Sequence, residues 1–360
     1  MSRQLLDLYT DYLIVSHSQT SSTGLSRMTD ETVSHDAITR MLSTTDLSRK
    51  DLWQAAKPLI KRVGSVDGVL ILDDTIAEKP HSKENEIVAW HFDHTQGRMV
   101  KGINILSMLY ENGGVRLPIG LQVIEKTETY VDKKSGKTRR RSPQSKNQQA
   151  REMLQWASTL RLLFSFVLAD SWFASAENMK LIHTTLEKHF VFALKGNRRV
   201  ALSAKQKEQG EYISACDVQI ESGHSVCVYL KELSFALRLA RYDFTHEDGK
   251  VSTLFLITDQ TSMHAPSMLN TYQRRWTVET YHKSLKQNTS LRSSPARRKT
   301  TQRTHIFASV FAFIKLESLT IATRNNHFAL KKRIYDAALR AAADELHRFK
   351  KQDPFFPVFA

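Results

Sequence analysis

The chain has 360 residues, of which 41% are hydrophobic and 25% are charged, as expected for a soluble globular protein with one large or two medium domains. The polar, periodic residues 1–13 do not resemble a signal peptide, and two cysteines alone, Cys216 and Cys227, exclude a cysteine-built zinc cluster. Lysine and arginine outnumber aspartate and glutamate 52 to 37, and this net charge of +15 favours nucleic acid over an anionic membrane as the partner.

Residues 1–64 predict a helical domain. Residues 4–15 are periodic in apolar side chains, and residues 34–42 predict a short helix that begins at Ser34, a favourable N-cap. Residues 51–63 predict a further helix. Short helices joined by a polar turn in a basic protein favour a helix-turn-helix-like DNA-binding domain, and a plain helical hairpin packed on the next domain is the alternative.

An α/β pattern follows over residues 65–196. Residues 68–74 predict a buried strand that ends in two acids, and two further strands flank a turn at 112–114. After a basic polar loop at 134–147, a helix leads into a second apolar strand that ends at Asp170. Another helix and strand follow, so the segment predicts the first part of an α/β core with a mixed sheet.

The next segment, 197–262, is rich in predicted strands and lacks the helices that a parallel sheet needs. It therefore predicts a β-rich insertion, with strands at 216–220, 224–233, 236–244 and 253–259. Residues 263–325 then complete the core with two helices, 266–287 and 301–324, separated by a basic segment.

The longest apolar run of the chain lies at residues 305–322. It contains Lys315 and Glu317, which is typical of a buried helix rather than of a membrane span. Residues 326–360 form a separate C-terminal segment with a basic helix predicted over 328–351.

Carboxylates end both predicted apolar strands of the core. Asp73 and Asp74 end the first strand, and Asp170 ends the second. Because binding sites in open α/β sheets form at the carboxyl ends of strands, these acids are expected to converge, with Glu279 of the helix 266–287 beside them. In a basic protein, converging carboxylates favour a pair of Mg²⁺ ions about 4 Å apart, an arrangement that can cut a phosphodiester bond.

One face of the predicted helix 266–287 places an acid among groups that bind phosphate. At about 100° per residue, four side chains fall within roughly 60° of one another: Tyr272, Arg275, Glu279 and Lys286. The acid would bind metal while its neighbours hold the DNA backbone, arginine as a fork and lysine as a point charge. For the acid alone, a solvated network of charges on an exposed helix is the alternative.

The spacing Tyr272-x2-Arg275-x3-Glu279-x6-Lys286 resembles the Y-R-E-K signature of the insertion-sequence-four family of bacterial DDE transposases. Two further motifs occur in the family's order: the D-D-T segment at 73–75 and the ADSWF segment at 169–173, followed by a β-rich stretch before the glutamate. The resemblance covers about residues 30–325 of this chain.

This resemblance implies a ribonuclease-H-like catalytic domain, an N-terminal DNA-binding domain and a metal-dependent transposase. It implies that Asp73, Asp170 and Glu279 are the catalytic residues and hold two Mg²⁺ ions, for which Mn²⁺ is expected to substitute. The reaction implied is cut-and-paste transposition, in which a freed 3′-hydroxyl attacks the opposite strand to form a hairpin before insertion.

The first acid of this triad has two candidates. Related nucleases and integrases carry D-x-T or D-x-S at this place, which favours Asp73, the residue directly after the apolar run. Side chains alternate along a strand, so Asp73 and Asp74 cannot both face the metals in regular geometry. Asp74 is the alternative, and an aspartate at a strand end is also a common turn or helix cap.

Aromatic residues near the acids have two interpretations. Trp172 follows Asp170 closely, and Trp276 closely precedes Glu279. Both could stack on an extruded base, but packing in the core is the expected role. Some relatives flip a base with a tryptophan of the β insertion. This insertion has none, so the role would fall to another of its aromatic residues: Tyr229, Phe235, Tyr242 or Phe244.

Other polar clusters are weaker candidates. The segment His91-Phe92-Asp93-His94 looks like part of a metal site, but further ligands are missing, so a pair of surface loop histidines is expected. The basic loops 137–141 and 297–303, the latter with Arg297 and Arg298, are expected to contact phosphates, and a solvated run of charge is the alternative.

These observations predict a cytoplasmic, nucleoid-associated bacterial DNA transposase. It would bind the terminal inverted repeats of its element and the target DNA as double strands, and it would act as a homodimer on paired ends. Two other functions share the same features: a catalytically inactive DNA-binding repressor descended from a transposase, and a metal-dependent nuclease without strand transfer.

Overall fold

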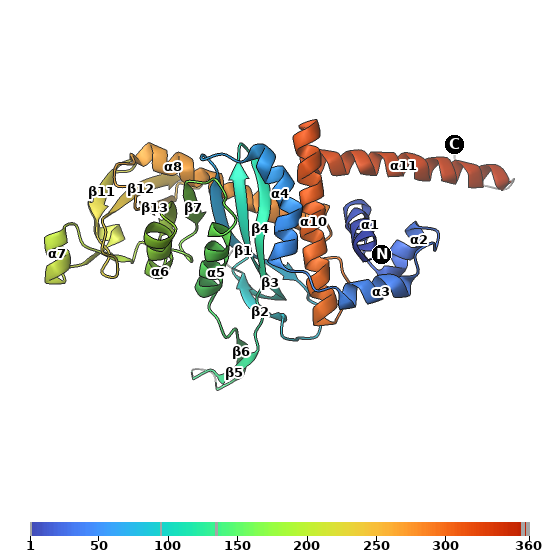
Figure 1. Ribbon diagram of the computed structural model, residues 1–360, viewed down its shortest axis with the longest axis horizontal. Coiled ribbons are helices and arrows are strands. Elements are labelled where there is room, and N and C mark those ends of the chain that lie inside the picture. Colours follow the sequence, from blue (N-terminus) through green and yellow to red (C-terminus); the bar gives the residue numbers. More distant parts are fainter. Residues whose placement is uncertain (1, 94–95, 134–135, 354–356, 358–360) are drawn as a thin grey trace. The chain divides into compact units, whose positions relative to one another are not determined.

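The structure of the chain is a computed structural model that describes residues 2–93, 96–133, 136–353 and 357 (Figure 1). The chain divides into two compact units. Unit 1 combines Met1–Asp46 with Lys283–Ala360, and unit 2 is the continuous segment Leu47–His282.

Within the described residues, unit 2 is built on a nine-stranded sheet in the order β11-β12-β13-β8-β7-β1-β3-β2, with β4 also paired to β3. β7 pairs in parallel with β1 and β8, and the other pairings are antiparallel. The expected mixed α/β fold is therefore confirmed. The strands are β1 (Val69–Glu78), β2 (Val88–Asp93), β3 (Arg98–Asn112), β4 (Val115–Val123), β7 (Phe166–Ala169), β8 (His189–Leu194), β11 (Ser225–Val228), β12 (Leu237–Thr245) and β13 (Val251–Thr258).

Two uninterrupted apolar runs place β1 and β7 at the centre of this sheet. Residues 69–72 of β1 and 167–169 of β7 are fully buried, which is typical of strands covered on both faces. In the parallel pair, Leu72 lies opposite Ala169, and the next residue of each segment is an acid. The register therefore brings Asp73 and Asp170 to neighbouring positions.

Helices and two small sheets complete unit 2. α4 (Arg49–Val63) and α5 (Lys146–Ser158) pack on β4, whereas α8 (Ala265–Gln273) packs on β8, β12 and β13. The other helical segments are α6 (Ala176–Lys180), the π-helix η1 (Leu181–Thr185), α7 (Ala204–Gln209), the 3₁₀ turns η2 (Ala215–Asp217) and η3 (Arg274–Trp276), and α9 (Thr277–Asn288), which crosses the boundary between the units. Two further two-stranded sheets pair β5 (Glu128–Val131) with β6 (Thr138–Arg141), as a hairpin, and β9 (Arg199–Val200) with β10 (Ile213–Ser214), on either side of α7.

The segment 197–262, which the sequence predicts as a β-rich insertion, contributes three strands to the main sheet. β13 pairs with β8 through buried residues 255–257, and β12 and β11 continue the sheet outward from there. This pairing satisfies the edge of β8, which would otherwise present unpaired backbone groups. Figure 1 shows these strands beside β7 and α8.

Two local predictions in unit 2 are wrong. The basic segment 137–141 is not an irregular loop, because β6 pairs with β5 and its Arg141 forms an ion pair with the cross-strand Glu128 at 3.1 Å. Residues 216–220 are not a strand: the chain leaves the short β9–β10 pairing and turns through η2.

Unit 1 is helical. Its helices are α1 (Ser2–Val15), α2 (Ser22–Met28), α3 (His35–Thr44), α10 (Lys299–Thr323) and α11 (His327–Gln352), together with the end of α9. Ser34 caps α3 as expected, since its Oγ accepts a hydrogen bond from the Ala37 amide at 3.2 Å. The core gathers apolar side chains from both ends of the chain: Tyr9, Tyr12, Leu13, Ile14, Leu25, Ile38, Met41, Leu42, Ala308, Ala312, Leu316 and Leu330.

These units divide the chain differently from the predicted domains. The sequence predicts one helical domain over 1–64, but α4 belongs to unit 2, because its buried face packs on β4. Helices α1 to α3 instead share their core with α10 and α11, so the segments 1–46 and 326–360, predicted as separate parts, lie in one unit.

Within the described residues, α10 is the one helix that is long and apolar enough to cross a membrane. Most of its apolar side chains are buried, and Ala308, Ala312 and Leu316 lie in the core that it shares with α1 and α3. The helix, with Lys315 and Glu317 within its apolar run, therefore lies where a core helix is expected.

Candidate active site

Asp73 and Asp170 form a pair of largely buried carboxylates at neighbouring positions of the sheet. Asp73 lies within β1, where its Oδ1 accepts a hydrogen bond from the Asp74 amide at 2.8 Å. Asp170 follows β7, and its Oδ1 accepts a hydrogen bond from the Trp172 amide at 2.9 Å. Burial and the negative charge of Asp170 raise the pKa of Asp73 to about 7. Burial also raises the pKa of Asp170, against the opposing effects of the Trp172 amide and the Arg275 charge.

Arg275 is the cation that faces these acids. Its Nη1 lies 3.6 Å from Asp73 Oδ2, and its Nη2 lies 3.7 Å from Glu279 Oε1. Only 12% of the Arg275 side chain is exposed. One guanidinium therefore links the carboxylate of β1 to the carboxylate of α9 and supplies positive charge between them.

Asp74 points away from this group. Its Oδ2 accepts hydrogen bonds from Lys146 Nζ at 2.8 Å and from Asn104 Nδ2 at 2.6 Å. This is the alternation expected along a strand, in which successive side chains face opposite ways. The structure thus places Asp73 beside Asp170 and gives Asp74 a different set of partners.

Glu279 lies in the first turn of α9, and its side chain is 52% exposed. The predicted helix 266–287 is interrupted before it by η3, so that the chain runs from α8 through a 3₁₀ turn into α9. A 3₁₀ turn winds more tightly than an α-helix and shifts the phase of the residues that follow. The four signature residues therefore do not form a single exposed stripe.

Tyr272 and Arg275, predicted as DNA contacts, are both largely buried. Tyr272 is 5% exposed on α8, and the Arg275 guanidinium carbon lies 5.3 Å from the centre of its ring. Burial raises the pKa of the Tyr272 phenol. The other predicted contacts differ: Lys286 lies in the last turn of α9, whereas Arg297 and Arg298 are exposed just before α10.

A family model for the DDE superfamily endonucleases matches residues 1–212 of the chain, which include Asp73, Asp170 and their strands. The chain belongs to this family. A search of curated proteins finds no match. Two solved structures are similar in part. Endonuclease V from Bacillus subtilis is 12% identical, with a TM-score of 0.25, and the match covers 73% of this chain and 91% of that chain. The Drosophila P element transposase strand transfer complex is 8% identical, with a TM-score of 0.26, and the match covers 87% of this chain and 64% of that chain.

DDE superfamily endonucleases generally use divalent metal ions, and the donor set of this DDE endonuclease fits such an ion. Two largely buried carboxylates, Asp73 and Asp170, lie at neighbouring positions with raised pKa values, because the charge of Arg275 does not outweigh the effect of burial. Such oxygens are the ligands that Mg²⁺ prefers. Among the residues described, no three acidic, histidine or cysteine side chains lie close enough together to hold an ion.

The two tryptophans near the acids of this DDE endonuclease are exposed, so the expected packing in the core is wrong for both. Trp172 is 48% exposed and Trp276 is 58% exposed. Trp172 lies in the turn after β7 with Lys146 and Lys195 over its ring, and Trp276 lies in η3 with Arg275 over its ring. Neither position is covered by an apolar layer, which the sequence alone does not reveal.

The aromatic residues proposed to hold a flipped base have varied surroundings. Tyr242 is buried and donates its hydroxyl hydrogen bond to the Ala265 carbonyl oxygen. Phe235 stacks on His183 with ring centres 3.8 Å apart. Both therefore have packing roles, whereas Phe244 is exposed and Tyr229 is half-buried.

His91 is not a surface loop residue, since it lies on β2. Burial and the charges of Lys126 and Lys146 lower its pKa to about 4, so it is neutral at physiological pH. Asp93 ends β2, and His94 lies outside the described residues.

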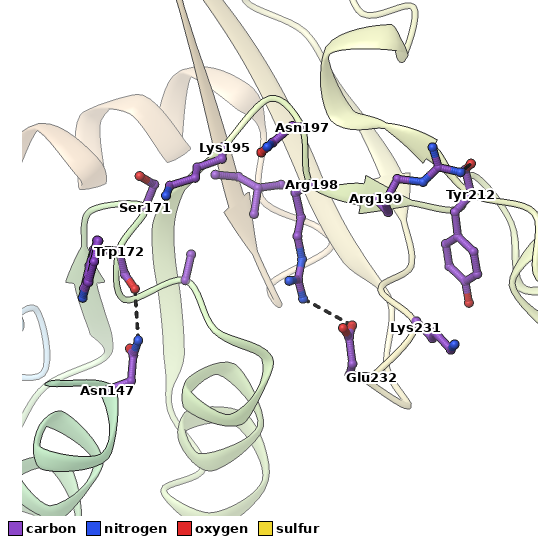
Figure 2. A pocket seen from close by; sticks show the side chains of 12 residues that line it. Asn147, Ser171, Trp172, Lys195, Asn197, Arg198, Arg199, Tyr212, Lys231 and Glu232 are labelled. Carbon is purple, nitrogen blue, oxygen red and sulfur yellow. Dashed lines mark hydrogen bonds and ion pairs between the residues drawn. The ribbon is translucent and has the colours of Figure 1, made fainter. Parts of the chain in front are cut away.

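The sequence does not single out a cavity of about 700 Å³ beside Asp170 (Figure 2). The KGNRR segment, 195–199, supplies part of its lining and is the one signal of it in the sequence. Lys146, the partner of Asp74, is a second residue that pattern alone does not reveal.

Proposed function

We propose that this DDE endonuclease is the transposase of an insertion sequence and belongs to the insertion-sequence-four family of bacterial transposases. The observation that carries the proposal is the pair of largely buried carboxylates, Asp73 on β1 and Asp170 directly after the parallel strand β7, with Glu279 linked to Asp73 through Arg275. The Y-R-E-K spacing of the sequence and the match to the endonuclease family support it.

The chemistry proposed is the transfer of a phosphoryl group in DNA. Asp73, Asp170 and Glu279 would hold two Mg²⁺ ions, which supply charge to activate the attacking hydroxyl group and to stabilise the leaving oxygen. Arg275 supplies positive charge between Asp73 and Glu279 in the absence of ions and so links the two carboxylates. Water cuts the element end to free a 3′-hydroxyl, which forms a hairpin on the opposite strand and, after reopening, joins to target DNA.

Recognition of the terminal inverted repeats is assigned to unit 1. The α2–turn–α3 segment has the form of a helix-turn-helix, and Thr39 Oγ1 of α3 donates a hydrogen bond to Ser22 Oγ of α2 at 2.9 Å. Ile38 and Leu42 anchor α3 in the core, which leaves His35, Thr39 and Arg40 exposed on its outer face. This is the face that we propose enters the major groove.

The test is cleavage of linear DNA that carries the element's ends, with and without Mg²⁺. A transposase cuts at the ends and joins them to target DNA; cleavage without joining identifies a nuclease, and specific binding without cleavage identifies a repressor. Asp170→Ala and Glu279→Ala should bind the ends and lose cleavage by on the order of a thousandfold or more, because the stabilisation of several kcal/mol that a bound ion gives is lost. Full cleavage by either variant would contradict the assignment.

The same assay distinguishes the two candidates for the first acid. Asp73→Ala should be as inactive as Asp170→Ala, since Asp73 shares its surroundings with Asp170 and Arg275. Asp74→Ala should lose no more than roughly tenfold, about 1.4 kcal/mol of barrier, because Asp74 binds Lys146 and Asn104 instead. The opposite order would move the site to Asp74.

A further inference from the structure

A cavity of about 700 Å³ opens within unit 2 beside the segment that directly follows Asp170 (Figure 2). Ser171 and Trp172, which follow Asp170 directly, form one wall, and the segments after β8 and β11 form the other. The lining residues that carry its chemistry are Trp172, Lys195, Arg198, Arg199, Tyr212 and Lys231. Its volume is within the usual range of about 300–1,000 Å³ for small-molecule sites, which is the scale of a nucleotide.

Trp172 is an exposed indole held in a fixed place. Its backbone amide donates to Asp170 Oδ1 at 2.9 Å. Its carbonyl oxygen accepts a hydrogen bond from Asn147 Nδ2 at 3.2 Å, which Figure 2 shows as a dashed line. Lys146 Nζ and Lys195 Nζ lie 5.4 and 5.7 Å from the centre of the ring. An aromatic face of this kind, kept in water between two cations, is suited to stacking on a base whose phosphates the cations attract.

The remainder of the lining is strongly basic. Its charged side chains are four cations and one acid: Lys195, Arg198, Arg199, Lys231 and Glu232. The acid forms an ion pair with Arg198 at 3.2 Å. Arg199 donates through Nη2 to the backbone carbonyl oxygen of Tyr212, whose side chain also lines the cavity (Figure 2). Positive charge that alternates with aromatic rings is the pattern by which proteins bind single-stranded nucleic acid without reading its sequence.

We propose that this cavity binds an unpaired segment of DNA, with a base stacked on Trp172 and the backbone phosphates on the basic wall. The inference rests on the proposed function only in taking DNA as the substrate. An unpaired strand is required because in a duplex the face of each base is covered by its neighbours and cannot reach the indole. Since the Trp172 amide donates a hydrogen bond to Asp170 Oδ1, a base stacked on this indole would lie close to one of the proposed catalytic acids.

The test measures binding of a fluorescent oligothymidylate and of a blunt duplex to the full chain, in chelator without divalent ions. Trp172→Ala should weaken binding of the single strand on the order of tenfold, the effect of losing one stacked base, and leave duplex binding within about twofold. Trp90→Ala is the matched control, because Trp90 is also 48% exposed and carries Lys101 at 5.8 Å from its ring centre. It should bind both probes as the unchanged chain does.

A second variant tests the basic wall independently of the ring. We expect that changing both Lys195 and Lys231 to Gln reduces the slope of log affinity against log salt concentration by about 1.4 for the single strand. Each lost phosphate contact accounts for about 0.7 of this change. Thymidine monophosphate at millimolar concentration tests whether a free nucleotide suffices, and the proposal expects that it competes far more weakly than the oligonucleotide. Melting curves of all variants establish that they are folded.

Two outcomes would overturn the proposal: equal single-strand affinities of Trp172→Ala and Trp90→Ala, or equal losses of single-strand and duplex binding in Trp172→Ala. Strong competition by the mononucleotide would replace the DNA strand with a free nucleotide as the ligand. Failure of the proposed transposase activity is a separate result, because no cleavage takes place in chelator and the binding assay does not depend on Asp73, Asp170 or Glu279.

Discussion

At the scale of single residues, Asp73 makes the stability of the protein depend on pH. Its pKa is about 7 in the folded chain, against 3.8 ordinarily, since burial and the charge of Asp170 favour the protonated form. The folded chain therefore holds a proton between pH 4 and 7 that the unfolded chain has released. The contribution of Asp73 to the free energy of unfolding is highest below pH 4. It falls as pH rises from 4 to 7, by on the order of 4 kcal/mol in total.

We accordingly expect Asp73→Asn to raise the melting temperature of the metal-free protein at pH 8 and to leave it unchanged near pH 4. The amide keeps the shape of the carboxyl group but removes the charge that burial disfavours. Thermal unfolding of both proteins from pH 4 to 8 in chelator measures the difference. Mg²⁺ should stabilise the unchanged chain more at pH 8 than at pH 5 and should have little effect on the Asn variant; a pH-independent difference would contradict the assignment of the titrating group.

The residues of the site differ in how far the sequence reveals them. Asp73 and Asp170 follow apolar runs that can only be central strands, so their convergence is predictable from the pattern and from the rule for parallel sheets. The position of Arg275 is not predictable in this way, because it depends on the 3₁₀ turn η3, and no residue of the segment YQRRW specifies such a turn. The exposure of Trp172 also depends on long-range packing, since it lies where the lining segments of the cavity leave a gap.

At the scale of elements, an ion pair fixes η3 to the end of β3. Arg274 Nε donates to Glu111 Oε2 at 2.6 Å and Nη1 donates to the Asp67 carbonyl oxygen at 2.7 Å, while the Glu111 side chain is almost fully buried. The next residue is Arg275, and Glu279 follows one turn later. This contact therefore sets the position from which both residues face the sheet.

Arg274→Ala should lower the free energy of unfolding by about 3 kcal/mol, because removing one partner leaves the buried Glu111 carboxylate without its charge. It should also reduce cleavage, since η3 and the start of α9 lose their anchor. Urea denaturation and the end-cleavage assay measure the two effects. Arg139→Ala is the control: its ion pair with Asp132, at 2.9 Å, lies on the exposed β5–β6 hairpin and should contribute no more than about 1 kcal/mol. Equal effects of the two variants would contradict the anchoring role.

Element predictions succeed where the apolar pattern is strong and fail where partners decide. The long helices α1, α10 and α11 and the strands β1 and β3 follow from periodicity or from apolar runs. By contrast, β6 is a basic segment that becomes a strand only because β5 lies opposite with Glu128. Residues 216–220 have a strand-like pattern but lack a partner strand in the described structure, so the pattern alone is not sufficient.

At the scale of the whole molecule, the helical unit is assembled from both ends of the chain. Tyr9, Leu13 and Ile38 from the first segment pack with Ala312 and Leu316 of α10 in one core. A domain built in this way cannot be recognised from a linear pattern, so the sequence alone predicts an independent domain over residues 1–64. It also changes the result expected from truncation.

Deleting residues 1–46 should remove specific binding of DNA ends and should also destabilise the segment that follows residue 282. The deletion uncovers the apolar face of α10, so the truncated chain should aggregate or lose protection of α10 and α11 against protease. Gel-shift assays and limited proteolysis with peptide mapping measure the two effects. A truncated chain that is soluble, that keeps α10 protected and that binds ends with unchanged specificity would show that unit 1 has neither role.

The last prediction concerns assembly on DNA. Cut-and-paste transposition acts on two ends, and one set of acids per chain suits one end, so the proposed function leads us to expect a two-fold dimer on paired ends. Two free chains, each with a net charge of +15, repel one another, and DNA phosphates would supply the negative charge between them. Light scattering should therefore find monomers in the free protein and dimers with DNA ends. The paired complex should dissociate as salt rises, because each phosphate contact releases a counterion. A single chain per end at all concentrations, with complete cleavage of both strands, would contradict the dimer.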